Sequence, residues 1–193
     1  MIGLRIMARA IAPAAMLAAL APLAGCNKAA DTPSAAATPS AATPSTDTLA
    51  TAIAGDKQLS KLAAALRETG LATVLDGAGA YTIIAPRDAA FAADPAKVAA
   101  IMEPANRAAL VALLRAHIVP GYLTPEDIGK AIDAAPGMPV TMRTMGDGVL
   151  TFTRSGSRID VTAPGGAHAA LGTPALRASN GVAIPVDGLL RTL

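Results

Sequence analysis

The chain has 193 residues, enough for one domain and a tail, and 52% of them are hydrophobic although only 2% are aromatic. Beyond residue 25 the 14 Lys and Arg equal the 14 Asp and Glu, and no run of like charge occurs. This balance and the scarcity of aromatic rings exclude a typical nucleic-acid surface, which needs a basic patch and side chains on which bases stack.

The first 25 residues predict a signal peptide that is removed. Residues 1–9 carry two arginines and no acid, and residues 10–24 form an apolar run that ends in small residues. The run is shorter than the roughly 20 residues of a membrane-spanning helix, and Pro13 and Pro22 disfavour a continuous helix.

The apolar run ends in Leu23-Ala24-Gly25-Cys26, which resembles the lipobox of bacterial lipoproteins. The resemblance implies cleavage before Cys26, a diacylglyceryl group on its thiol, and an acyl chain such as palmitate on its new amino group. Two or three chains hold a membrane far better than one, because each buried CH₂ adds roughly 0.8 kcal/mol. By the same resemblance Asn27 favours the outer membrane of a bacterial cell envelope, on its periplasmic or surface face. The alternative is a soluble secreted protein with an incidental cysteine.

Residues 26–47 predict the lipidated cysteine followed by a disordered tether rich in Ala, Thr, Pro and Ser. Thr-Pro-Ser recurs at 32–34, 38–40 and 43–45, and no large apolar residue is present to offset the entropy of ordering. Prolines favour extended chain, so about 20 residues span up to roughly 60 Å. We expect the tether to hold a folded domain, residues 48–193, off the membrane.

Helical patterns fill the first half of this domain. Thr48 or Asp47 is placed to cap a helix that stops near Gly55, and Thr124 is followed three residues later by an acid. Gly70 is placed to end the helix before it. We expect helices near 48–55, 59–70, 71–75, 94–102, 104–116 and 124–135.

The stretch Tyr81–Phe91 predicts a strand that runs into a helix. Residues 81–84 are β-branched or aromatic, and Pro86 ends the strand because proline has no N–H for the ladder. Asp88 stands before Ala-Ala-Phe, where its carboxylate is placed to cap the new helical turn.

Period-two patterns dominate the second half. We expect strands at 117–119, 140–144, 149–154, 158–162, 168–171 and 182–186, with the third and fourth joined as a hairpin. Pro185 within the last strand indicates an edge or a bulge. Helices come first and strands last, so the predicted fold class is α+β.

Three of these stretches, taken together, resemble the fasciclin (FAS1) domain family. They are Tyr81–Phe91, residues 113–121 around Ala116-His117, and residues 178–190 with Asn180-Gly181 and Asp187-Gly188. The resemblance covers about 48–193 and implies a wedge or sandwich of β-strands packed with several helices. It also implies a role in adhesion or extracellular interaction and no general enzymatic activity. The family often has Tyr-His where this chain has Ala116-His117, so a receptor contact made there by animal members does not transfer.

Asp88, His117 and Asn180 are the candidate core of the site. In one interpretation Asp88 and His117 share a polar cleft. In the other, His117 donates a hydrogen bond to the Pro86–Asp88 corner and locks it, because a buried imidazole needs a partner. Asn180-Gly181 is typical of a turn.

Phe91, Tyr122 and Met142 are candidates for an apolar ligand groove, since some members of the family bind carotenoid-like molecules; ordinary core packing is the alternative. The sequence has no nucleophile elbow, phosphate-binding loop or dinucleotide fingerprint, so we predict no catalytic residue and no cofactor. Its single cysteine and two scattered histidines predict no metal site.

Two functions remain open. The first is a lipid-anchored adhesion or interaction module of the cell envelope, with a membrane contact through its lipid and an extracellular or periplasmic protein or glycan as its partner. The second is a periplasmic or surface carrier of a small apolar ligand, carotenoid- or lipid-like. A flat exposed patch favours the first, and a large open groove the second.

Overall fold

The computed structural model describes residues 45–191 of the chain. The expected signal peptide, Cys26 and most of the expected tether therefore lie outside the described residues. The helices are α1 (Leu49–Gly55), α2 (Ser60–Thr69), α3 (Leu71–Asp76), α4 (Asp88–Ala92), α5 (Pro95–Ile101), the short 3₁₀ helix η1 (Pro104–Asn106), α6 (Arg107–Ala116) and α7 (Pro125–Ala134). The strands are β1 (Tyr81–Pro86), β2 (Ile118–Pro120), β3 (Val140–Arg143), β4 (Val149–Ser155), β5 (Arg158–Thr162), β6 (His168–Ala170), β7 (Leu176–Ala178) and β8 (Gly181–Val186).

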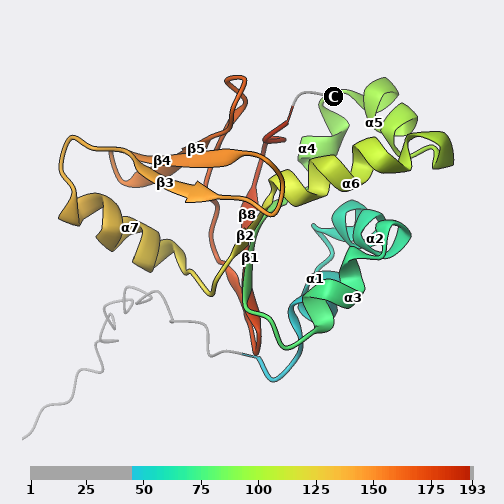
Figure 1. Ribbon diagram of the computed structural model, residues 1–193, viewed down its shortest axis with the longest axis horizontal. Coiled ribbons are helices and arrows are strands. Elements are labelled where there is room, and N and C mark those ends of the chain that lie inside the picture. The colour runs from blue at the N-terminus through green and yellow to red at the C-terminus, as the bar shows by residue number, and fades with distance from the viewer. Residues whose placement is uncertain (1–44, 192–193) are drawn as a thin grey trace, which may run out of the picture. The chain divides into compact units, whose positions relative to one another are not determined.

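The first sheet has the strand order β2-β1-β8-β7 (Figure 1). Its two central strands are parallel, with Tyr81 opposite Gly181 and Pro86 opposite Val186, while β2 and β7 run antiparallel to them. Every residue of β8 is buried, and so is every residue of β1 after Tyr81. Such a pair, covered on both faces, requires the nearly continuous apolar runs seen in both strands.

The second sheet is an antiparallel meander in the order β3-β4-β5-β6. Strands β4 and β5 form the expected hairpin, in which Gly156 takes a positive φ of 62° that a two-residue turn favours. Two sheets packed with helices confirm the predicted α+β class.

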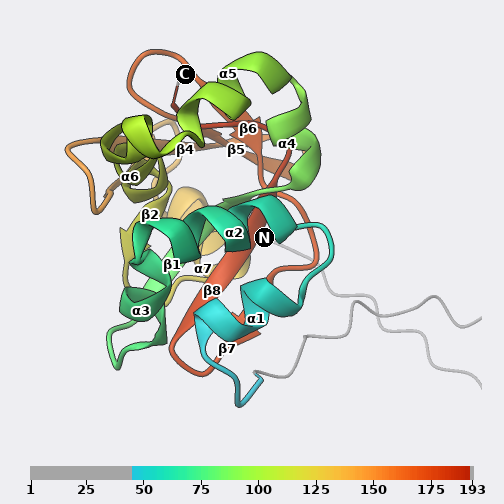
Figure 2. The same cartoon turned by 90° about the vertical axis from the view of Figure 1, so that its right-hand side faces the viewer.

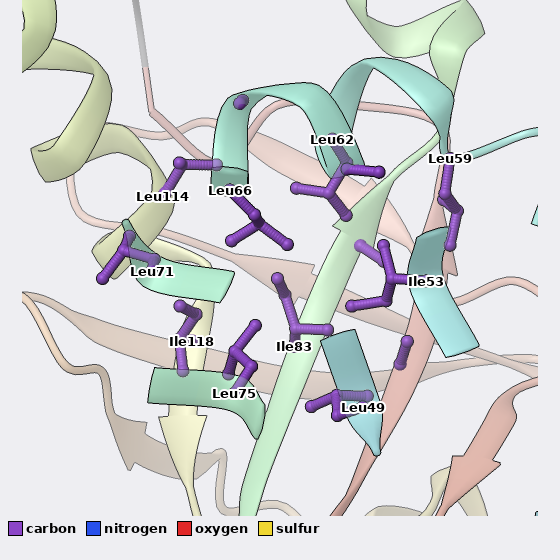
Figure 3. Close-up of a cluster of buried hydrophobic side chains, with 14 of the residues drawn as sticks. Leu49, Ile53, Leu59, Leu62, Leu66, Leu71, Leu75, Ile83, Leu114 and Ile118 are labelled. Carbon is purple, nitrogen blue, oxygen red and sulfur yellow. The ribbon is translucent and has the colours of Figure 1, made fainter. Parts of the chain in front are cut away.

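Alternate residues of β1 and β8 serve two different hydrophobic clusters. Ile83 and Ala183 belong to the first cluster, with side chains from α1, α2, α3 and α6. Figure 3 shows Ile83 surrounded by leucines and isoleucines from these helices. Ile84 and Ile184 belong to the second cluster, with side chains of α7 and the second sheet. Figure 2 shows α1, α2 and α3 in front of β1 and β8, so these two strands form the layer between the clusters.

Local capping follows the sequence closely. The Thr48 side chain accepts a hydrogen bond from the backbone N–H of Thr51, and α7 begins with a capping box between Thr124 and Asp127. The hydrogen bonds from Thr124 hold the pKa of Asp127 below its ordinary value. Gly70 ends α2 in the left-handed conformation that glycine adopts without strain.

Two features of the first sheet differ from the expectations. Strand β7 was not expected, and its pairing makes β8 an inner strand despite Pro185. Strand β7 ends its pairing at Ala183, and the Pro185 carbonyl instead accepts a hydrogen bond from the Gly172 N–H at 2.6 Å. The missing N–H of Pro185 faces this side, beyond the end of β7, where Leu171 forms only an isolated bridge with Val186. An inner strand thus accommodates the proline, and the expectation of an edge strand was wrong.

Among the helices described, none is both long enough and apolar enough to cross a membrane.

Candidate functional site

Asp88 caps a helix other than its own. It is the first residue of α4, and its carboxylate accepts the backbone N–H of Lys61 at 2.8 Å and the Ser60 hydroxyl at 2.5 Å. The Asp88 N–H in return donates to the Gln58 carbonyl at 2.8 Å. These contacts satisfy the N-terminus of α2, which has neither a side-chain cap nor an acid in its first turn. The expectation that Asp88 caps the turn after it was therefore wrong.

His117 is fully buried and uses both ring nitrogens. Its Nδ1 lies 2.8 Å from the Leu113 carbonyl, and its Nε2 accepts the Leu190 N–H at 2.9 Å. Because the Leu190 amide only donates, the neutral ring carries its proton on Nδ1. Burial lowers the pKa of His117 from 6.5 to about 4, which keeps the ring neutral.

The position of His117 corrects the prediction made for it. The ring reaches neither Asp88 nor the Pro86–Asp88 corner; its backbone carbonyl accepts the Ile84 N–H at 2.8 Å. His117 thus joins the end of α6 to β1 and to the last described turn of the chain.

Asn180 holds together the ends of two helices. Its Oδ1 accepts the Leu49 N–H at the start of α1, at 2.7 Å. Its Nδ2 donates to the carbonyls of Leu75 and Gly77 at the end of α3, at 2.8 and 2.6 Å. Both polar groups of the amide are therefore bound to backbone from segments more than 100 residues away in the sequence.

The three candidate core residues do not form a shared cleft. Each one satisfies backbone groups at the end of a helix or strand, and each has a different set of partners. None is left with a free polar group directed at a ligand, so their role in the described structure is to stabilise the fold.

The three candidates for a ligand groove are also separate. Phe91 is 2% exposed in the first cluster, whereas Met142 packs against the second. Tyr122 is 37% exposed in the loop between β2 and α7. These side chains do not line one groove, and ordinary core packing accounts for Phe91 and Met142.

An apolar cavity that no sequence pattern indicated lies at the end of α7. Its volume is about 690 Å³, and its lining is formed by Ile132, Asp133, Ala135, Pro136, Gly137, Met138, Pro139, Thr153 and Arg154. Met138 is 69% exposed, an unusual environment for a large apolar side chain. Pro136, Gly137 and Pro139 in one short run marked a loop in the sequence, but nothing local indicated a hollow beside it.

An ion pair forms one wall of this cavity. The Arg154 guanidinium contacts both carboxylate oxygens of Asp133 at 2.9 Å, and its Nη2 donates to the Gly129 carbonyl at 3.2 Å. The two charges neutralise one another, so the cavity offers apolar surface and no unpaired charge. Within residues 45–191, no group of three His, Cys, Asp or Glu is arranged to hold a metal ion.

Comparison with known proteins gives a consistent result. A family model described as the fasciclin domain matches residues 57–192. The chain is 37% identical, over 87 residues, to the protein named sll1483 of Synechocystis sp. (strain ATCC 27184 / PCC 6803 / Kazusa); the match covers 45% of this chain and 48% of that protein. A solved FAS1 domain pair from the insect cell adhesion molecule Fasciclin I aligns with a TM-score of 0.63 at 16% identity, over 76% of this chain and 51% of the other. The chain thus spans about half the length of these relatives, and the structural match shows the fold.

Proposed function

Because the chain belongs to the fasciclin domain family, we propose that it is a lipid-anchored interaction module of a bacterial cell envelope that holds a protein or glycan partner. Fasciclin domains are generally linked to cell adhesion and protein interaction. The observation that carries this proposal is the match of residues 57–192 to the fasciclin domain. Asp88, His117 and Asn180 make their hydrogen bonds inside the fold, so contacts with a partner fall to the exposed surface.

The anchor rests on the sequence Leu23-Ala24-Gly25-Cys26. Acylation at Cys26 and a tether through residue 47 would keep the domain at the membrane and let it reach a partner roughly 60 Å away. The outer membrane, on its periplasmic or surface face, is the location that Asn27 favours.

Cell fractionation tests the anchor. Wild-type protein should sediment with membranes, and Cys26→Ser should release it to the soluble fraction, since an oxygen cannot take the thioether lipid. Ser34→Ala, a matched change in the tether, should stay with the membranes. Membrane retention of Cys26→Ser would contradict the anchor.

The cavity beside Met138 favours a second candidate function, a carrier of a small apolar ligand. Its volume lies within the roughly 300–1,000 Å³ of known ligand sites. If the carrier function is correct, protein purified from cells yields an apolar compound on solvent extraction, and Met138→Gln lowers that yield. Val74→Gln changes another exposed apolar side chain, on α3, and should leave the yield unchanged. An empty wild-type extract would leave the interaction module as the function.

A further inference from the structure

One face of the second sheet carries a row of hydroxyl groups that the fold does not use. The strand register places Thr141 opposite Thr151, Thr151 opposite Thr162, and Thr162 opposite His168. These four residues form one line across β3, β4, β5 and β6. Thr153, two residues along β4 from Thr151, lies opposite Asp160 and starts a second line on the same face.

The burial pattern shows that this face is open. Leu150, Phe152 and Val161 alternate with the threonines along their strands and are buried in the second cluster. Figure 1 shows α7 beside β3 and β4, and the pairing of Asp133 with Arg154 places that helix on the side of the buried residues. The threonines thus point away from the core: Thr141 and Thr153 are exposed, and Thr151 and Thr162 are half-buried between neighbouring strands.

The hydroxyls of this face lack protein partners in the described part of the chain. By contrast, the Thr82 hydroxyl donates to the Gly121 carbonyl at 2.8 Å, and the Thr144 hydroxyl donates to the Gly148 carbonyl at 3.1 Å. The hydroxyls of Thr141, Thr151, Thr153 and Thr162 make no such bond. Each one can donate one hydrogen bond and accept two.

The arrangement suits a polymer that is itself rich in hydroxyl groups. Cross-strand neighbours are about 4.5–5.5 Å apart, and residues two apart on one strand about 6.5–7 Å, so the groups form a regular grid on a rigid support. Fixed positions reduce the entropy lost on binding. Protein partners, in contrast, usually need a buried apolar or aromatic centre, and the described part of this face has no Phe, Tyr or Trp.

The charged side chains on the face indicate the sign of the ligand's charge. Arg143 on β3 and Arg158 on β5 are exposed and form no ion pair within residues 45–191, and Asp160 is the acid on the same face. His168 at the end of the row is exposed, with its Nδ1 3.4 Å from the Gly166 carbonyl. Two cations against one acid favour an anionic partner.

We propose that the threonine face of β3–β6 is the binding surface for an acidic polysaccharide of the uronic-acid class. Sugar hydroxyls bond the threonine rows and Asp160, and uronate carboxylates pair with Arg143 and Arg158. The inference rests on the proposed interaction function and assigns its partner to the glycan class.

Calorimetry with the full-length protein tests the proposal, with alginate oligosaccharides as the acidic probe and dextran as the neutral one. Alginate should bind, more weakly as salt rises, and dextran should bind at least several-fold more weakly. Thr151→Val with Thr162→Val keeps shape and strand preference but removes two hydroxyls, and should weaken alginate binding roughly tenfold. Arg143→Gln should weaken binding and reduce its salt dependence.

Matched changes outside the face serve as controls. Thr73 on α3 and Arg67 on α2 are exposed and lie outside the face. Thr73→Val and Arg67→Gln should therefore leave the affinity for alginate unchanged. Melting curves show whether each variant is folded. Failure of wild type to bind alginate, equal affinity for dextran, or full binding by the folded double valine variant would each overturn the proposal, as would a protein partner that occupies this face. If wild-type protein binds alginate but stays in the soluble fraction of cells, the envelope anchor is refuted and this inference still stands.

Discussion

Acid should destabilise this fold through His117, because the ring is buried and its acceptor nitrogen faces an amide N–H. Burial lowers its pKa from 6.5 to about 4. Between these values the unfolded chain binds one proton more than the folded chain. The contribution of His117 to the unfolding free energy is therefore fully present above pH 6.5. Below pH 6.5 this contribution falls by roughly 1.4 kcal/mol per pH unit, and it stops changing near pH 4, after a total loss of about 3 kcal/mol.

The structural reason is a change of role at one atom. Protonation turns Nε2 of His117 from an acceptor into a donor that faces the donating Leu190 N–H. Leu190 is 1% exposed, so neither group can turn to water without local opening. The segment around Leu190 should therefore loosen first in acid.

Urea unfolding of the full-length protein at pH 7.5, 6.5, 5.5 and 5.0 measures the effect. Wild type should lose roughly 2 kcal/mol of unfolding free energy between pH 6.5 and 5.0. His117→Gln cannot titrate, so it should be less stable at pH 7.5 but should lose much less on acidification. His168→Gln, which removes the exposed histidine, should behave as wild type. A flat wild-type profile, or the same slope in His117→Gln, would refute the reasoning.

Two further predictions concern the same supports. Asp88→Ala removes the cap of α2 and should lower the unfolding free energy by about 1 kcal/mol in urea titrations. Asp187→Ala breaks only an exposed ion pair with Arg87, so it should lower the unfolding free energy by less than about half of that amount. Equal losses would mean that Asp88 acts only as a surface charge. Gly181→Ala places a Cβ against the Tyr81 carbonyl oxygen and 2.7 Å from Leu49 Cδ2. It should therefore lower the unfolding free energy by roughly 2 kcal/mol or more. An unchanged melting temperature would show that β1 and β8 can move apart to accept the methyl group without loss of stability.

The sequence predicted best those features that depend on neighbouring residues. Thr48 and Thr124 each bond an N–H three residues ahead, and Gly70 ends a helix by its own backbone freedom. All of this information lies within one helical turn, so the positions of α1, α2 and α7 follow from it. The hairpin of β4 and β5 was predicted for the same reason, because the alternation of apolar and polar residues along each strand is also a local pattern.

The sequence failed where a side chain has distant partners. Asp88 has the local pattern of a cap, but its acceptor role is used by α2, 27 residues earlier. His117 was matched to the corner near Asp88, while its partner is Leu190, 73 residues later. Strand β7 has only three residues and no clear alternation, so it forms because β8 offers an edge. The Met138 cavity depends on how α7 and β4 meet, which no local pattern encodes.

Support and binding use separable residues in this domain. Asp88, His117 and Asn180 bond only to backbone or to a neighbouring hydroxyl inside the fold, whereas the hydroxyls of Thr151 and Thr162 have no protein partner in the described structure. Variants of the first group should therefore change unfolding free energy far more than glycan affinity at a pH where they stay folded. The valine variants should do the reverse, because replacing these two unpartnered hydroxyls with methyl groups breaks no hydrogen bond of the described structure. If both groups of variants changed stability and affinity in parallel, the threonine face would be part of the fold's support, and binding would have to be assigned to another surface.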